Sequence, residues 1–438
     1  MSHSMPPAPD AGSTPPTPRP TTASTTTTPP PEPRFQRALG EMLSSSWLVT
    51  VLAIVLALVL SAVLVAASDS QVQTTAGYLF ARPSDFLTAV WHAVSSAYLA
   101  LFQGSIFDSG APTFARAIKP ITETMTVSTP LILAGLGLGV GFRAGLFNIG
   151  AQGQIILGAT FAAYVGFAWD LPVGVHLVVA VVAAAIGGGL WAGIAGVLKA
   201  RTGAHEVIVT IMLNNIAVYF VAFLLTLSAF QRGSSNNPIS PPVASNAEFP
   251  LLLGSQFRLH AGFLLAIGAA VFVWWLMNRS TIGFQFRAVG SNPRASRVAG
   301  ISVNAAYIWV MVVAGALAGL AGAAQVLGTE KSLTDGVAAS FGFDAITVAL
   351  LGRSKPLGTV LAGLLFGGLR AGGFAMQART GTPIDIVLVV QSLIVLFIAA
   401  PPLVRALFRL PTRGERPRPA ALTGSTAPTA STLTEASA

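Results

Sequence analysis

The chain has 438 residues, of which 53% are hydrophobic and only 9% are charged, and its formal net charge is +9. Soluble domains carry about 25% charged residues, so this composition excludes a soluble globular protein and indicates one that crosses a membrane many times. Cysteine is absent, which excludes disulfides and thiolate chemistry, and the positive charges lie at the ends of apolar segments, which favours membrane orientation over nucleic-acid binding.

The two ends of the chain differ in composition from its middle. Residues 1–40 and 411–438 are rich in Pro, Thr, Ser and Ala, a composition that buries too little apolar surface to offset the conformational entropy lost on folding. We therefore predict a disordered N-terminal tail, a membrane domain over 41–410 and a disordered C-terminal tail.

Apolar runs long enough to cross roughly 30 Å of hydrocarbon recur through the middle of the chain. We expect membrane spans at 47–66, 121–141, 149–168, 173–198, 207–230, 262–277, 305–327, 357–374 and 386–400. A shorter run at 343–351 is about half a span, and counting it gives about ten crossings. The sequence therefore predicts an all-α, polytopic membrane bundle with interrupted helices. The longest loop, 68–119, carries an amphipathic patch around 86–102.

Basic residues predict how the bundle is oriented. With an even number of spans, both tails lie on the same side of the membrane. In a ten-span count, that side also receives the following residues: Arg34, Arg37, Lys199, Arg201, Arg279, Arg287, Arg294, Arg297, Arg353, Lys355, Arg405 and Arg409. Because loops rich in Lys and Arg stay in the cytoplasm, we expect both termini to be cytoplasmic.

A polar but uncharged segment interrupts the apolar sequence at 145–154, GLFNIGAQGQ. Unpaired peptide groups cost several kcal/mol in hydrocarbon, so irregular backbone there must line a watery cavity or pack inside protein. Asn148, Gln152 and Gln154 offer neutral donors and acceptors to a polar solute, and Phe147 offers a surface on which a base could pack. Asn214, inside a later span, has the same character. Each amide has a structural alternative, which is to satisfy the broken backbone or to bridge helices.

A second interruption, 352–358, follows the half-length run and reads GRSKPLG. Two interrupted hydrophobic segments in the two halves of a transporter indicate a translocation path between structural repeats, although coincidence remains open in a glycine-rich chain. Glycines at 187–189, 315 and 319 are typical of closely packed membrane helices.

The loop 279–303 contains start and stop signals for a very short helix. Asn292 is a favourable N-cap, Pro293 suits the first helical position, and Gly300 follows the end. A helix over 293–299 is too short to cross a membrane, so we interpret it as a docking element for a soluble partner. The alternative is a basic loop that lies on anionic lipid.

Ionisable residues near the spans are the remaining polar signal, because charge inside a membrane is expensive. Glu206 has an ordinary interpretation as an ion-pair or helix N-terminal carboxylate, and Asp344 as a helix N-terminal one. Arg370 is the hardest of these residues to explain by an ordinary structural role, although its side chain could extend toward the membrane surface.

Four stretches of the chain carry a resemblance to a known family: 145–154, 206–214 (EVIVTIMLN), 287–301 (with RAVGSNP and AGI) and 342–358 (with GFDAITVALLG and PLG). The chain resembles the permease subunits of ATP-binding-cassette (ABC) importers of the simple-sugar and nucleoside type, over about 47–408. It is most similar to the nucleoside branch. The long first loop and the N-terminal tail depart from the family pattern.

The resemblance implies an importer in the bacterial cell membrane with several subunits. A second permease subunit, often non-identical, would complete the pathway, an ABC ATPase would bind beneath, and an extracytoplasmic lipoprotein would deliver the solute. The short helix would correspond to the family's coupling helix. The residues assigned to ATPase coupling are Arg287, Asn292, Pro293, Arg294, Arg297 and Gly300, and those assigned to the pathway are Phe147, Asn148, Gln152, Gln154 and Asn214.

Two alternatives stay open on the sequence. An ion-coupled secondary transporter of a small polar solute would favour a carboxylate near mid-membrane, and the long spans carry none at their centres. A simple sugar could replace the nucleoside as solute. No phosphate-binding loop, metal-ligand spacing or catalytic triad is present, so we expect no enzymatic activity, cofactor or metal in this chain.

Overall fold

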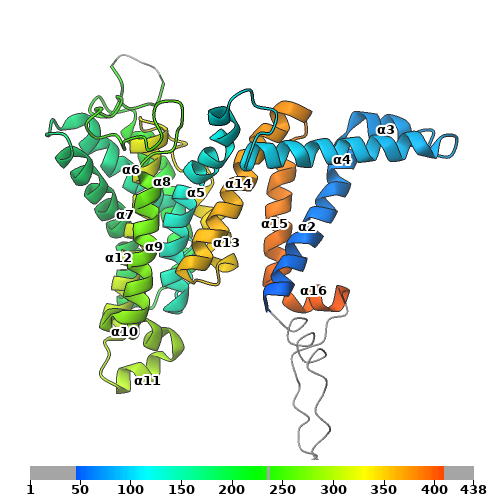
Figure 1. Ribbon diagram of the computed structural model, residues 1–438. Helices are drawn as coiled ribbons and strands as arrows, with labels where there is room; N and C mark the ends of the chain where they lie inside the picture. The colour runs from blue at the N-terminus through cyan, green and yellow to red at the C-terminus, as the bar shows by residue number, and fades with distance from the viewer. Residues whose placement is uncertain (1–45, 234–236, 409–438) are drawn as a thin grey trace, which may run out of the picture. The chain divides into compact units, whose positions relative to one another are not determined.

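The computed structural model describes residues 46–233 and 237–408. Helices are the only extended regular elements there, and two isolated β-bridges join loops. The helices are α2 (Ser46–Ser68), α3 (Ser70–Ala76), α4 (Pro83–Ser105), α5 (Phe114–Arg143), α6 (Ala151–Ala168), α7 (Val175–Thr202), α8 (Glu206–Leu224), α9 (Gly262–Arg279), α10 (Thr281–Ser291), α11 (Pro293–Val298), α12 (Val303–Ala323), the π-helix η1 (Ala324–Thr329), α13 (Phe341–Leu351), α14 (Pro356–Thr380), α15 (Asp385–Ala399) and α16 (Pro401–Leu407) (Figure 1). The predicted tails, 1–40 and 411–438, lie outside the described residues, so their disorder stays a prediction.

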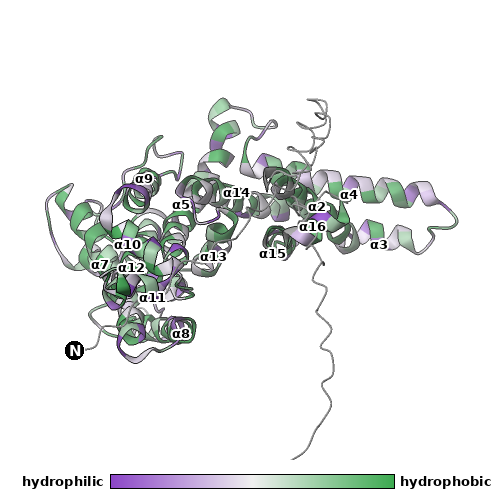
Figure 2. Cartoon of the chain, turned by 90° about the horizontal axis from the view of Figure 1, so that it is seen from below, coloured by the Kyte–Doolittle hydropathy of each residue, from purple (hydrophilic) through white to green (hydrophobic). Residues whose placement is uncertain are grey.

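Seven of the described helices are long and apolar enough to cross a membrane: α2, α5, α7, α8, α9, α12 with η1, and α14. Three shorter or more polar helices stand at the other predicted positions. The helix α6 has 18 residues but carries two glutamines among its first four, α13 has 11 residues, and α15 has 15. The all-α polytopic bundle with interrupted helices is therefore confirmed. Viewed along the bundle, apolar residues cover most helix faces (Figure 2).

One predicted span was too long. The helix α8 ends at Leu224, whereas an apolar run to 230 suggested a longer helix. The chain turns after Leu224 because Phe230 folds back and stacks on Tyr164 at 5.3 Å between ring centroids, with Phe167 edge-on at 5.8 Å. Aromatic packing against α6 therefore replaces the last helical turns, which hydropathy alone does not reveal.

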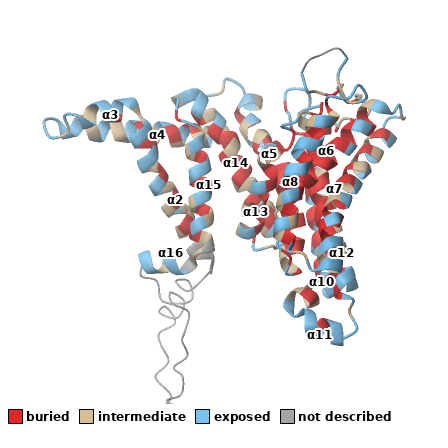
Figure 3. Cartoon of the chain, turned by 180° about the vertical axis from the view of Figure 1, so that it is seen from behind, coloured by how far each residue is buried: buried red, intermediate tan, exposed pale blue. Residues whose placement is uncertain are grey.

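The centre of the bundle is built by α5, α6, α7 and α12, whose inner faces are buried while α2 and α15 keep many exposed side chains (Figure 3). Small residues make this packing close. A Cβ on Gly319 of α12 would lie 2.2 Å from the carbonyl oxygen of Ala184 in α7, and one on Gly188 would lie 2.3 Å from that of Gly315. Backbones at this distance have no room for a side chain, which confirms the predicted glycine packing.

The loop 68–119 is largely helical. The amphipathic patch predicted around 86–102 lies within α4, where Ala93 and Ala97 are buried while Leu87 and Trp91 are exposed. Asp69 caps α3 by accepting hydrogen bonds from two backbone N–H groups. The helix α5 then begins at Phe114, ahead of the predicted span start, because Thr113 supplies an N-cap that accepts a hydrogen bond from the N–H of Arg116.

Candidate functional site

The first interruption, residues 144–150, separates α5 from α6 and packs against the loop 279–303. A Cβ on Gly290 of α10 would lie 2.4 Å from the carbonyl oxygen of Arg143, and one on Gly145 would lie 3.2 Å from the Cα of Gly290. Gly145 also has a positive φ of 73°, which favours glycine. Sequence reasoning gave the interruption and the loop separate roles, whereas their backbones are in direct contact.

One polar stripe on α8 satisfies the irregular backbone of this interruption. Glu206, Thr210 and Asn214 are spaced four residues apart and therefore share one helix face. Glu206 and Thr210 accept hydrogen bonds from the backbone N–H groups of Phe147 and Ile149, at 3.4 and 3.3 Å. Asn214 donates to the carbonyl oxygen of Ile149 at 2.8 Å. The sequence singled out Asn214 but not the stripe, although its spacing on an apolar helix was a usable signal.

Asn148 and Gln154 stabilise the first interruption through hydrogen bonds between their own side chains. Each side-chain amide donates to the carbonyl oxygen of the other, at 3.2 and 3.1 Å, and Asn148 also accepts from the N–H of Gly150 at 2.8 Å. Both side chains are almost completely buried. These two residues thus form a reciprocal amide pair that fixes the entry into α6.

Gln152 joins the first interrupted segment to the second. Its amide donates to the carbonyl oxygen of Ala339 at 2.6 Å and accepts from the N–H of Gly342 at 3.0 Å. These partners lie just before and at the start of α13. A Cβ on Gly342 would lie 2.3 Å from the backbone N of Gln152, so the two segments are in close contact.

The predicted pathway residues therefore gather at one place, but most face protein groups. Asn148, Gln152, Gln154 and Asn214 are buried, and all four amides have hydrogen-bond partners in the protein. Phe147 differs, because it is 41% exposed and stacks on Phe142 at 5.0 Å between ring centroids. The contacts fit the structural interpretation of the amides, and their role in a pathway stays a prediction.

A polar cavity of about 260 Å³ lies between α5, η1, the segment before α13, and α14. We call it the Gln325 cavity. Its lining residues are Thr126, Val127, Arg258, Gln325, Thr329, Glu330, Gly336, Val337, Ala339, Phe341, Arg370 and Phe374. It adjoins Gln152, one of the amides predicted to line a pathway, because Ala339, which lines the cavity, is also the partner of Gln152. Sequence reasoning missed this cavity because its walls come from five separate stretches of the chain.

Arg370 is held at the wall of the Gln325 cavity by three contacts. Its Nη1 donates to the hydroxyl of Ser340 and to the carboxylate of Asp344, both at 3.1 Å. The guanidinium also lies over the ring of Phe341, 4.4 Å from its centroid. The sequence noted Arg370 and Asp344 separately. Because they sit on different helices, no spacing rule joins them, and only the fold reveals the ion pair.

A wider charged vestibule of about 710 Å³ shares Val127, Arg258 and Phe374 with the Gln325 cavity. The charged groups that line it form two ion pairs, Arg379 with Asp108 at 2.6 Å and Arg258 with Glu123 at 3.4 Å, and also include Arg116 and Lys119. The hydrogen bond from Arg379 holds the pKa of Asp108 below its ordinary value. The shared walls show that the vestibule adjoins the cavity.

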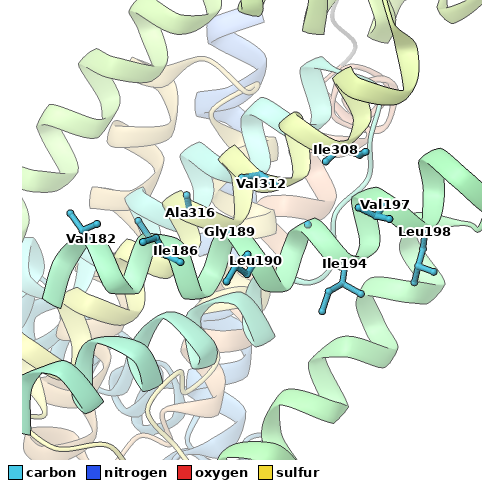
Figure 4. A pocket seen from close by; sticks show the side chains of 12 residues that line it. Val182, Ile186, Gly189, Leu190, Ile194, Val197, Leu198, Ile308, Val312 and Ala316 are labelled. Carbon is cyan, nitrogen blue, oxygen red and sulfur yellow. The ribbon is translucent and has the colours of Figure 1, made fainter. Parts of the chain in front are cut away.

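An apolar groove on the surface of the bundle is a different kind of site. A groove of about 790 Å³ runs along the outer faces of α7 and α12, and Val182, Ile186, Leu190, Ile194 and Val312 are among its lining residues (Figure 4). All of its lining residues are apolar or glycine, so it offers a polar solute no side-chain hydrogen bond. It suits lipid chains and is not the candidate solute site.

The short helix predicted at 293–299 is present as α11, Pro293–Val298. Asn292 caps it by accepting hydrogen bonds from the N–H groups of Arg294 and Ala295, both at 3.0 Å, and Gly300 follows with a φ of 82°. Only one side chain of α11, that of Ser296, is buried. Arg294, Arg297 and Val298 are exposed, so no other described part of the chain buries the basic and apolar side chains of this helix.

The helix before α11 was not predicted. Thr281–Ser291 form α10, because Ser280 caps it by accepting a hydrogen bond from the N–H of Gly283. Arg287 lies on this helix, and its Nη1 is buried without a hydrogen-bond partner among the described residues. It is near enough to Arg143 for the two positive charges to repel. The two arginines thus meet where α10 contacts the first interruption.

Comparisons with known proteins agree with this architecture. The family model described as branched-chain amino acid transport system / permease component matches residues 121–399. A guanosine ABC transporter permease of Bacillus subtilis, NupP, is 42% identical over 310 residues, which cover 70% of this chain and 86% of that protein. No solved structure matches the chain.

Two further relatives carry different solute names. A nucleoside ABC transporter permease of Lactococcus lactis, NupB, is 36% identical over 64% of this chain and 79% of that protein. A glucose ABC transporter permease of Haloferax volcanii, TsgB13, is also 36% identical, over 64% of this chain and 75% of that protein. All three relatives are named as permease proteins of ABC transporters.

Proposed function

The chain belongs to the family of branched-chain amino acid transport system permease components, and on this premise we propose that it forms the membrane pathway of an ABC importer for nucleosides. The observation that carries the proposal is the 42% identity to a guanosine permease over 86% of that protein. A polar cavity inside an otherwise apolar bundle supports it, because a solute pathway needs hydrogen-bonding groups within the membrane.

The chain is a transport component that spans the membrane several times, and we propose that a separate ATPase supplies the energy. The docking element would be α11. Its exposed Arg294, Arg297 and Val298 offer charged and apolar contacts to a soluble partner. A lipid-binding loop would need the arginines but not the N-cap, the proline and the terminal glycine that give α11 its defined shape.

The orientation and the remaining partners are also proposals. We place α11 in the cytoplasm together with Lys199, Arg201, Arg353 and Lys355, because loops rich in basic residues stay inside. Both termini would then be cytoplasmic. A second, non-identical permease subunit and an extracytoplasmic substrate-binding lipoprotein would complete the importer, as the family resemblance implies.

A glucose-type solute is the second candidate, because one 36% identical relative is named as a glucose permease. Uptake measurements separate the candidates. Cells that carry the complete importer and cells that lack only this chain are compared for uptake of labelled guanosine and labelled glucose. Guanosine uptake that depends on this chain supports the nucleoside proposal. Chain-dependent uptake of glucose with no effect on guanosine would replace it with the second candidate.

A further inference from the structure

We propose that the Gln325 cavity binds one neutral nucleoside during transport and that the amide of Gln325 pairs with the edge of its base. This inference rests on the proposed function and deepens it by naming the binding residue and the class of solute. It follows from three observations: an amide without a partner, arginines that are already paired, and an adjoining vestibule.

Gln325 is the unusual residue in the cavity wall. It is only 5% exposed, it lines the cavity, and neither side-chain atom of its amide has a hydrogen-bond partner within the described residues. Gln152, another buried glutamine, uses both ends of its amide. The Gln325 amide is not among the fully buried polar groups without a partner, so it is accessible from the cavity, and a ligand there can hydrogen-bond to both ends of the amide.

The backbone at Gln325 is also irregular. It lies at the start of η1, and the N–H of Glu330 donates to its carbonyl oxygen at 2.8 Å, five residues back rather than four. Such a π turn shifts the side chains that follow α12 relative to a regular helix, and single π turns occur frequently at functional sites. The amide is thus placed by a defined distortion and not by a loose loop.

The two arginines that line the cavity are already paired, and its one further charged group is a carboxylate, which favours a neutral solute. Arg258 is paired with Glu123 at 3.4 Å, and Arg370 is paired with Asp344 at 3.1 Å. Glu330 adds an exposed carboxylate at the lining. A phosphate group would meet one surplus negative charge and two arginines that are already paired. The cavity therefore disfavours a nucleotide and accepts an uncharged nucleoside.

The shape of the amide suits the base of that nucleoside. A glutamine side chain places a donor and an acceptor side by side, and this pair matches the adjacent donor and acceptor on the edge of a nucleobase. Phe374, which is 55% exposed and lines both the cavity and the vestibule, offers an apolar surface where the two adjoin. The volume of about 260 Å³ admits one small solute at a time.

The test uses the complete importer in membrane vesicles, with labelled guanosine as the probe. Gln325→Leu keeps the size of the side chain and removes its donor and acceptor. We expect KM for guanosine to rise at least tenfold, about 1.4 kcal/mol, with the maximal rate within twofold. Gln325→Glu removes the donor and adds a negative charge, and should raise KM in the same way. The matched control is Gln391→Leu in α15, since Gln391 is 7% exposed but lies outside the cavity lining.

Competition tests the class of solute in the same vesicles. Excess unlabelled guanosine should abolish uptake, whereas guanosine monophosphate and glucose should leave it unchanged. Because the chain has no cysteine, Thr329→Cys provides a second measurement: guanosine should protect this cysteine at the cavity wall from an aqueous thiol reagent. This measurement decides the proposal if the Gln325 variants fail to reach the membrane.

The outcomes separate this inference from the proposed function. A wild-type KM in Gln325→Leu, or labelling of Thr329→Cys that guanosine does not slow, would overturn the site while uptake still depended on the chain. Competition by glucose would overturn the class of solute. If guanosine uptake did not depend on the chain at all, the proposed function itself would fail.

Discussion

At the scale of single residues, two neighbouring asparagines in α8 show how a polar side chain is used inside a membrane helix. Asn214 is 5% exposed, accepts from the N–H of Gly153 at 2.9 Å and donates to the carbonyl oxygen of Ile149 at 2.8 Å. Asn215 is exposed and bonds only within its own helix, to the carbonyl oxygen of Ile211. The same side chain therefore joins two segments of the chain at one position and bonds only within its own helix at the next.

We predict that Asn214→Leu destabilises the protein and Asn215→Leu does not. The first change orphans two buried backbone groups, each worth about 1–3 kcal/mol, while the second leaves the first interruption intact. Thermal unfolding in detergent, followed by intrinsic tryptophan fluorescence, measures the difference. Equal unfolding temperatures for the two variants would show that the stripe on α8 does not hold the interruption.

His260 is predicted to make stability depend on pH. It is 1% exposed, and its Nδ1 accepts a hydrogen bond from the N–H of Gly262 at 3.2 Å. Burial, with the nearby charge of Arg258, lowers its pKa to about 4. Between about pH 6.5 and pH 4 the unfolded chain binds a proton that the folded protein excludes, so stability falls as the pH falls, by up to about 1.4 kcal/mol for each pH unit.

His260→Gln should remove that part of the pH dependence. Unfolding temperatures of the wild type and the variant are compared at pH 7.5 and at pH 4.5. We expect the variant to lose less stability on acidification than the wild type does. Parallel losses in the two proteins would contradict a neutral, buried His260.

At the scale of elements, the contact between α7 and α12 rests on glycines. A Cβ on Gly319 would lie 2.2 Å from the carbonyl oxygen of Ala184, whereas a Cβ on Gly268 in α9 would meet nothing within 4 Å. Gly319→Ala should therefore separate the two helices and lower the unfolding temperature. Gly268→Ala should be neutral or slightly stabilising, because alanine favours the helix. Equal effects would mean that helix propensity, and not close packing, decides the outcome.

The helix α11 carries the prediction about energy coupling. Replacing Arg294 and Arg297 with glutamate reverses the charge of its exposed surface, so solute-stimulated ATP hydrolysis by the assembled importer should be lost. Membrane insertion should persist, because α11 makes few contacts with the bundle. Arg82→Glu is the control. Arg82 is also an exposed arginine, with 76% of its side-chain surface exposed, and it is remote in sequence from α11. Undiminished stimulation in the α11 variant would contradict docking there.

The sequence predicted the positions of the helices better than it predicted the contacts between them. Hydropathy located the spans and the half-length α13, and cap chemistry located α11, because both signals are local. Three features join residues far apart in the chain. They are the hydrogen bonds from α8 to the first interruption, the ion pair of Arg370 with Asp344, and the Gln325 cavity. Such contacts depend on how helices pack. The π turn at Gln325 lies inside the run 305–327, which hydropathy assigns to a single span, so hydropathy gave no sign of the turn.

At the scale of the whole molecule, contacts run without a gap from the vestibule to α11. The vestibule and the Gln325 cavity share walls, and Ala339 at the cavity wall bonds to Gln152 of α6. The first interruption, which leads into α6, touches Gly290 of α10, and α10 leads directly into α11.

The most direct measurement is guanosine transport by the purified importer in sealed vesicles. ATP is supplied on the side of the membrane that the ATPase faces. We predict that uptake requires both hydrolysable ATP and this chain, and that proton or sodium gradients without ATP drive none. Accumulation of guanosine by this chain alone, driven by an ion gradient with no ATPase present, would contradict the account.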